Sequence, residues 1–232
     1  MIEFIPTSFI FFLMAGVLAL FPHGLMRGVL LLITPLLAVF HIWYIGFGNF
    51  WPYEFFGFDL ELMRVDRLSR IFVLVFCLAS FLGNLFAWHV RDTIQQVAAL
   101  LYAGSAIGAA LSGDMISLFF YWEATALTSV FLIWARGTEG AYHTGLRYLI
   151  VQIGSGVILI AGVCLFYQET GEVSFNKMTL ESLGTWLIFI SFGIKCAFPL
   201  MHNWLQDSYP AATVTGAVIL SAFTTKMAIY AL

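Results

Sequence analysis

Long apolar runs, broken by short polar segments, form the main pattern along this chain. A helix that crosses the hydrocarbon core of a bilayer needs about 20 predominantly apolar residues. Eight runs approach that length, and they cover about residues 4–21, 28–47, 69–89, 94–111, 114–134, 145–167, 183–200 and 213–232. Lipid cannot satisfy backbone hydrogen-bonding groups, so each run is expected to be a helix. The pattern therefore predicts an all-α, polytopic membrane protein with about eight transmembrane helices.

The polar segments between these runs differ in length. Residues 48–68 form the longest connection, which we expect to be a charged loop, and residues 168–182 form a second, acidic loop. The links at 90–93 and 112–113 are so short that the helices they join are expected to be antiparallel neighbours. The positive-inside rule chooses no orientation, because the loops on the two sides of the membrane hold equal numbers of basic residues. One side would hold Arg27, Arg91, Arg136 and Arg147, and the other Arg64, Arg67, Arg70 and Lys177. The long acidic loops slightly favour an N-terminus outside.

Composition excludes several classes of protein. Of the 232 residues, 61% are hydrophobic and only 10% are charged, against roughly a quarter in soluble domains. A net charge of −3 with no basic patch argues against nucleic-acid binding. The first apolar run follows Glu3 rather than basic residues, so it is interpreted as a retained span and not as a cleaved signal peptide.

Three ionisable residues fall near the middle of expected spans: Glu123, Lys195 and Lys226. On insertion scales each costs roughly 2.5–3.5 kcal/mol at mid-bilayer, and such residues usually mark ion or proton pathways. The structural alternative is a buried ion pair that only holds helices together, although desolvation offsets much of the gain from such a pair. The sequence therefore favours a functional interpretation of these three charges.

A buried lysine and a movable carboxylate can act together as a proton switch. Burial favours the neutral amine, whereas a nearby carboxylate favours the ammonium form. If Glu123 approaches Lys195, the lysine keeps its proton, and if Glu123 moves away, the lysine becomes a proton donor. Lys226 is then a candidate for the next acceptor. This chemistry requires no metal ion and no cofactor.

The second half of the seventh expected span contains a helix-breaking signal. Pro199 lacks the N–H group that would bond to the carbonyl of Lys195, four residues earlier, and its ring clashes with that carbonyl. We expect this span to kink or break there, or alternatively to end at Pro199. His202, just beyond, is a candidate proton relay between Lys195 and water, and an ordinary interfacial histidine is the alternative.

These residues resemble the signature of the antiporter-like membrane subunits. This family includes the proton-pumping membrane subunits of respiratory complex I and the large D-type subunits of Mrp cation/proton antiporters. The resemblance covers about residues 94–232. It rests on Phe120–Glu123, on Gly193–Leu200 followed by His202, Trp204 and Asp207, and on Thr224–Tyr230. Asp207-Ser208-Tyr209 makes the D-type component of Mrp antiporters slightly closer.

The resemblance implies a fold and a set of roles. Residues 1–93 would contain three leading helices, and residues 94–232 would form the first of two five-helix repeats, with the second repeat absent. Glu123 would tune Lys195, and Lys226 would lead toward a central hydrophilic axis. The sequence departs from the family pattern at Gln206 and near Ala212, where a proline is usual.

The resulting hypothesis is a subunit that translocates protons, alone or with Na⁺ or K⁺, within a larger complex. The complex would resemble NADH:quinone oxidoreductase or an Mrp antiporter, and this chain would hold no redox centre of its own. Other membrane subunits, including one that supplies the second repeat, would be its partners in a bacterial inner membrane. The alternatives are a non-conducting structural or assembly subunit, and a haem protein ligated by His41 and His89, which are expected in opposite leaflets.

Overall fold

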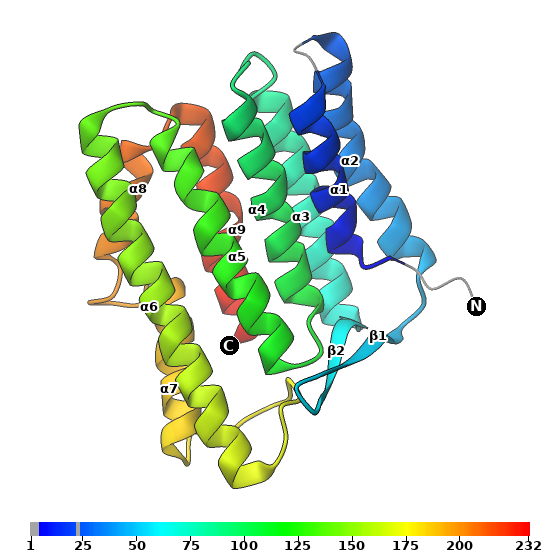
Figure 1. The fold of residues 1–232 in the computed structure, drawn as a ribbon, viewed down its shortest axis with the longest axis vertical. Coiled ribbons are helices and arrows are strands. Elements are labelled where there is room, and N and C mark those ends of the chain that lie inside the picture. The colour runs from blue at the N-terminus through cyan, green and yellow to red at the C-terminus, as the bar shows by residue number, and fades with distance from the viewer. Residues whose placement is uncertain (1–4, 22–23) are drawn as a thin grey trace.

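The computed structural model describes residues 5–21 and 24–232, so Glu3 and the first residue of the expected span 4–21 lie outside the described part. Residues with apolar side chains form a bundle of helices (Figure 1). The helices are α1 (Thr7–Leu20), α2 (Leu25–Tyr44), α3 (Arg67–Phe86), α4 (Thr93–Leu111), α5 (Met115–Trp134), α6 (Glu139–Thr170), α7 (Leu183–Lys195), α8 (Asn203–Ala211) and α9 (Val214–Ala231).

Six of the described helices are long and apolar enough to cross a membrane: α2, α3, α4, α5, α6 and α9. Helices α1 and α7 are also apolar but shorter, with 14 and 13 residues. The prediction of an all-α membrane fold is therefore confirmed. Helix α6 is longer than expected, because it begins at Glu139 and ends at Thr170 rather than covering only residues 145–167.

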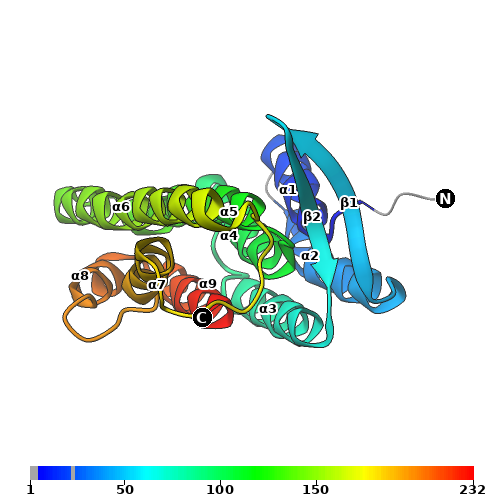
Figure 2. The same cartoon turned by 90° about the horizontal axis from the view of Figure 1, so that it is seen from below.

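Helix α4 lies at the centre of the bundle. It packs against α1, α3, α5 and α9, and most of its residues are buried. Seen from the end of the bundle, α4, α5 and α6 form one row, and α3, α9, α7 and α8 face it (Figure 2). Small residues allow this close approach: a Cβ atom on Gly104 would lie 2.7 Å from the Cβ of Phe11 on α1.

Residues 48–68 do not form the irregular loop that we expected. They contain an antiparallel hairpin of β1 (Gly48–Phe55) and β2 (Phe58–Val65), in which Phe55 pairs with Phe58. Phe56 and Gly57 form the turn with φ of 51° and 81°, the two positive values that a tight type I′ turn requires. Hydrophobicity does not reveal this element, because polar residues interrupt its apolar and aromatic residues and leave no long apolar run. The hairpin lies across one end of the bundle (Figure 2).

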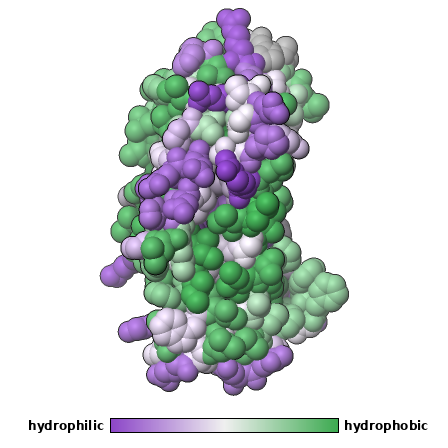
Figure 3. Space-filling model, turned by 90° about the vertical axis from the view of Figure 1, so that its left-hand side faces the viewer, coloured by the Kyte–Doolittle hydropathy of each residue, from purple (hydrophilic) through white to green (hydrophobic). Residues whose placement is uncertain are grey.

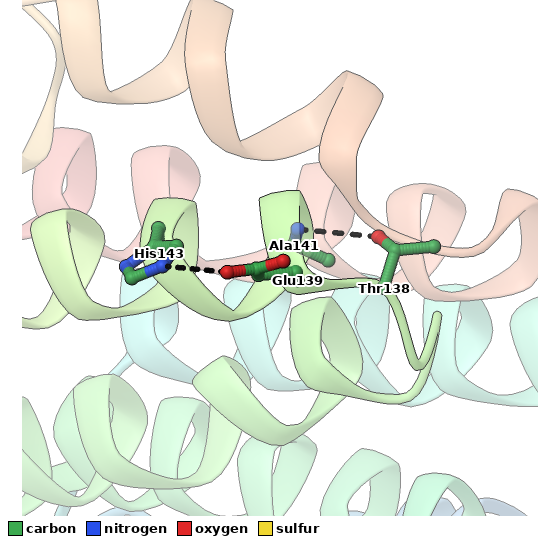
Figure 4. A network of polar contacts seen from close by, with 4 residues as sticks. All are labelled: Thr138, Glu139, Ala141 and His143. Carbon is green, nitrogen blue, oxygen red and sulfur yellow. Dashed lines mark hydrogen bonds and ion pairs between the residues drawn. The ribbon is translucent and has the colours of Figure 1, made fainter.

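Helix starts follow from side-chain caps. The Thr138 hydroxyl accepts a hydrogen bond from the Ala141 amide at the start of α6, and Glu139 forms an ion pair of 3.8 Å with His143 one turn later (Figure 4). Asp66, Asp92, Asp114, Ser182 and Thr213 cap α3, α4, α5, α7 and α9 in the same way. For α2, the N-cap residue is Gly24, which has no side chain to cap the helix.

The side that carries α6, α7 and α8 is divided by polarity. A belt of apolar residues crosses the lower part of this face, and hydrophilic residues gather above it (Figure 3). The exposed polar residues at the start of α6 and on α8 are Glu139, His143, Arg147, Asn203, Gln206 and Asp207. The apolar belt is the surface that lipid tails can cover.

Asp114 joins the hairpin to the bundle, which leads to a prediction about stability. Its carboxylate accepts hydrogen bonds from the Ser117 amide (2.7 Å), the Ser117 hydroxyl (2.7 Å) and the Glu61 amide in β2 (2.8 Å). We expect Asp114→Ala to lower the free energy of unfolding by about 2–3 kcal/mol, through the lost cap and the unpaired Glu61 amide. Thermal unfolding of the purified protein in detergent measures this change.

Asp92→Ala is the matched control, because Asp92 caps α4 through one exposed hydrogen bond to the Ile94 amide. It should cost about 1 kcal/mol or less. Equal losses in both variants would show that the bond between Asp114 and the hairpin contributes little.

Candidate functional site

Lys195 is the last residue of α7 and is completely buried, with 0% of its surface exposed. The helix ends there because the next residues turn: Ala197 and Leu200 adopt positive φ values of 61° and 71°. Pro199 lies in this turn, and the chain becomes helical again at Asn203. The predicted break near Pro199 is confirmed, although the helix ends four residues before the proline rather than at it.

Neutral groups of α5 hold the Lys195 ammonium. Its Nζ donates to the Trp122 carbonyl at 2.5 Å and to the Thr125 hydroxyl at 3.0 Å. It also lies 4.2 Å from the centroid of the Trp122 ring, a distance at which a cation is attracted to an aromatic face. These contacts solvate the ammonium without a formal negative charge.

Glu123 is separated from Lys195 in this structure. Within the described residues, the one ion pair joins His143 and Glu139, so no ion pair connects Glu123 to Lys195. The two charges still interact electrostatically. The Glu123 Oε1 atom is buried and makes no hydrogen bond to any described residue. Glu123 and Lys195 are therefore not within ion-pair distance of each other in this structure.

Gly156 on α6 provides the space for the Glu123 carboxylate. A Cβ atom on Gly156 would collide with Oε1 of Glu123, whereas a Cβ on Gly154 would meet nothing within 4 Å. We call the space beside Gly156 the Gly156 recess. Only glycine leaves this space free, so α6 determines where the carboxylate of α5 can lie.

Buried polar groups on α6 link the site to its neighbours. The Trp122 indole donates to the Ser155 hydroxyl at 3.2 Å, and the Ser191 hydroxyl of α7 donates to the Ser155 carbonyl at 2.7 Å. Gln152, one helical turn before Gly156, is fully buried, and neither of its amide atoms has a partner among the described residues. Such groups are rare in folded proteins and gather where a polar arrangement changes.

A cluster of buried hydroxyl groups lies on one side of Lys195. Ser129, one turn after Thr125, contacts the Tyr148 hydroxyl at 2.7 Å. Tyr148 also interacts with Thr224 of α9, whose hydroxyl lies 2.5 Å from that of Tyr102. The cluster joins α4, α5, α6 and α9 in the interior. Its member Ser129 is four residues along α5 from Thr125, which accepts from Lys195.

Lys226 and His202 are not brought together with Lys195. Lys226 is exposed on α9, and its Nζ donates to the Ser221 carbonyl at 2.7 Å. It follows Thr224 by two residues, so it lies on the opposite side of α9 from the hydroxyl cluster. His202 is half-buried at the N-cap position of α8, and its side chain caps nothing there.

Sequence reasoning does not find the roles of some site residues, although Trp122 and Trp204 belong to the segments that carry the family resemblance. Trp122 and Thr125 flank Glu123, but apolar and hydroxyl side chains are common in membrane helices and give no sign that they bind an ammonium. Trp204 donates its indole N–H to the Ile194 carbonyl at 2.9 Å and so fixes α8 beside the end of α7. Gly156 belongs to a Gly-Ser-Gly segment that indicates close packing only.

Comparisons with known proteins find relatives of this chain. The family model described as NADH:quinone oxidoreductase/Mrp antiporter, TM, matches residues 112–232, which is just over half of the chain. The chain is 26% identical over 212 residues to NADH-quinone oxidoreductase subunit M of Pseudomonas aeruginosa, covering 82% of this chain and 41% of that protein. It is 25% identical over 187 residues to the D-type component of the Na(+)/H(+) antiporter of Bacillus subtilis, covering 74% and 38%.

The fold also occurs in a solved archaeal respiratory complex, the membrane-bound sulfane sulfur reductase. A chain of that complex superposes with a TM-score of 0.82 at 21% identity, covering 97% of this chain and 51% of that one. This chain therefore spans about two fifths of the length of the curated relatives and about half of the structural one.

The Gly156 recess yields a prediction about packing. Gly156→Ala should destabilise the protein by about 1–3 kcal/mol, because the new methyl group overlaps the Glu123 carboxylate and forces it to move. Gly154→Ala is the matched control on the same helix and should be neutral or stabilising by up to about 1 kcal/mol. Thermal unfolding in detergent measures both.

A double-mutant cycle with Glu123→Ala identifies the cause. Removal of the carboxylate leaves room for a methyl group, so Gly156→Ala should cost much less in the Glu123→Ala background. If the cost of Gly156→Ala is the same in both backgrounds, the carboxylate does not occupy the recess.

Proposed function

Because the chain belongs to the NADH:quinone oxidoreductase/Mrp antiporter family of membrane subunits, we propose that it translocates protons within a multisubunit membrane complex. Lys195 carries the proton, Glu123 controls its release, and Lys226 accepts it on the way out. One observation carries this proposal: a completely buried lysine side chain, whose Nζ contacts neutral groups, lies at the end of a broken apolar helix.

The energetic cost of burying Lys195 supports a functional role. An unpaired ammonium near mid-bilayer costs roughly 2.5–3.5 kcal/mol on insertion scales, which apolar packing would avoid. A lysine amine can gain and lose a proton, and its ammonium form repels metal cations. The ion that this site moves is therefore the proton, and any coupled Na⁺ or K⁺ binds elsewhere.

Movement of Glu123 provides the control. In the Gly156 recess the carboxylate makes no ion pair with Lys195, and this separation favours release of the lysine proton. When the carboxylate leaves the recess and approaches Lys195, the ammonium form is favoured again.

The second part of the route lies toward α9. The hydroxyl cluster of Ser129, Tyr148, Thr224 and Tyr102 leads from the neighbourhood of Lys195 to this helix. Lys226 lies on the outer side of α9, so a further membrane polypeptide or repeat must cover that side. His202 then relays protons at the end of the bundle that contains α8.

The family and the relatives support the setting of this activity. The matched proteins are named as subunits, so we expect the chain to work with other membrane subunits. The two relatives described above are bacterial, which supports placement in a bacterial inner membrane.

Substitution of Lys195 tests the proposal. Lys195→Ala should reduce proton movement by at least about a hundredfold, as expected when a proton-transferring group is lost. Lys195→Arg should assemble but also fail, because arginine does not give up its proton. The measurement follows a pH-sensitive dye in membrane vesicles that contain the assembled complex, normalised to the amount of this chain.

Lys177→Ala, at an exposed lysine in the 168–182 connection, is the control and should keep wild-type proton movement. Wild-type proton movement in both Lys195→Ala and Glu123→Gln would refute the switch. That result would favour the non-conducting structural subunit instead.

A further inference from the structure

A cavity of about 310 Å³ lies at the end of the bundle opposite the hairpin. It is formed where the start of α2 meets the connection between α3 and α4, both at the upper end in Figure 1. Its lining includes Gly24, Arg27, Trp88, Arg91 and Gln96. None of the residues that line this cavity belongs to the proton route proposed above.

Arg27 makes this cavity chemically unusual. Its side chain is only 3% exposed, and Nη1 donates to the Phe21 carbonyl at 3.2 Å. The Nε and Nη2 atoms are buried and have no hydrogen-bond partner among residues 5–21 and 24–232. A buried guanidinium with free N–H groups is costly unless an anion binds it.

Asp92 does not pair with Arg27. The two side chains interact electrostatically, but the one ion pair of the described residues joins His143 and Glu139. The Oδ1 atom of Asp92 accepts the hydrogen bond from the Ile94 amide that caps α4. Gln96 donates to the Val90 carbonyl at 2.7 Å, and no described residue donates to its Oε1 atom. Hydrogen-bond donors thus dominate the cavity, and Gln96 offers one acceptor for a hydroxyl group.

The start of α2 adds a second anion-binding feature. This helix has 20 residues, and no side chain caps its N-terminus, where Gly24 and Leu25 line the cavity. Free backbone N–H groups and the helix dipole make such an N-terminus attractive to phosphate. Arg91 adds a second positive charge from the other wall.

We propose that this cavity binds the phosphate group of an anionic phospholipid. The planar guanidinium of Arg27 suits two phosphate oxygens at once. Leu25 and Met26 beside the cavity are 73% and 67% exposed, so acyl chains can lie along them. The cavity is at the end of the apolar helices, where headgroups lie, and Trp88 is placed as aromatic residues are at a membrane surface.

Lipid retention by the purified complex tests this site. Native mass spectrometry in detergent would count bound phosphatidylglycerol, with phosphatidylcholine and inorganic phosphate as separate additions. We expect the wild type to retain phosphatidylglycerol over phosphatidylcholine. Arg27→Gln should weaken this binding by about tenfold or more, as expected for lost hydrogen bonds to a charged group.

Two further variants keep the test decisive. Arg91→Gln changes an exposed residue, so it should fold even if Arg27→Gln does not, and it should also weaken phosphatidylglycerol binding. Arg147→Gln, at an exposed arginine of α6, is the control and should bind as the wild type does. Equal lipid retention in all variants would overturn the proposal. Binding of inorganic phosphate without retention of phosphatidylglycerol would overturn the assignment to a phospholipid.

Discussion

A completely buried lysine amine, with no carboxylate in ion-pair contact among the described residues, is the constraint on which the rest of this structure depends. Trp122 contacts Lys195 in two ways, because its carbonyl accepts from Nζ and its ring faces Nζ. Its indole N–H donates to the Ser155 hydroxyl. Because Ser155 also accepts from Ser191, helices α5, α6 and α7 are joined around one side chain. The contacts that surround the Lys195 amine therefore also hold these three helices together.

The break after α7 allows this arrangement without leaving the end of the helix unsatisfied. A helix end exposes carbonyl groups that have no intrahelical partner. Here the Ile194 carbonyl accepts from the Ala197 amide and from the Trp204 indole, and the Gly193 carbonyl accepts from the Phe198 amide. The turn is therefore a bonded structure, and α8 is held against it. Lys195 can end its helix in the interior because the following residues complete the backbone bonding.

The sequence predicts the helices well because apolar length is a strong signal, and it identifies Glu123 and Lys195 because charges in apolar runs are rare. It fails where the signal is geometric. The hairpin at Gly48–Val65 lacks a long apolar run, so hydrophobicity did not distinguish it from a loop. The separation of Glu123 from Lys195 depends on a missing Cβ at Gly156, and Gly154, two residues away, has the same side chain and no such role.

The two lysines face opposite surroundings, and this difference constrains any proton route. Thr224 points into the hydroxyl cluster, whereas Lys226 is exposed and reaches back along α9 to Ser221. An ammonium exposed to lipid at this depth would be as costly as a buried one, so the outer side of α9 requires a polar cover. A proton that reaches Thr224 must then pass around α9 at the boundary with that cover. In the proposed route, Lys195 is controlled within this chain, and Lys226 acts at an interface.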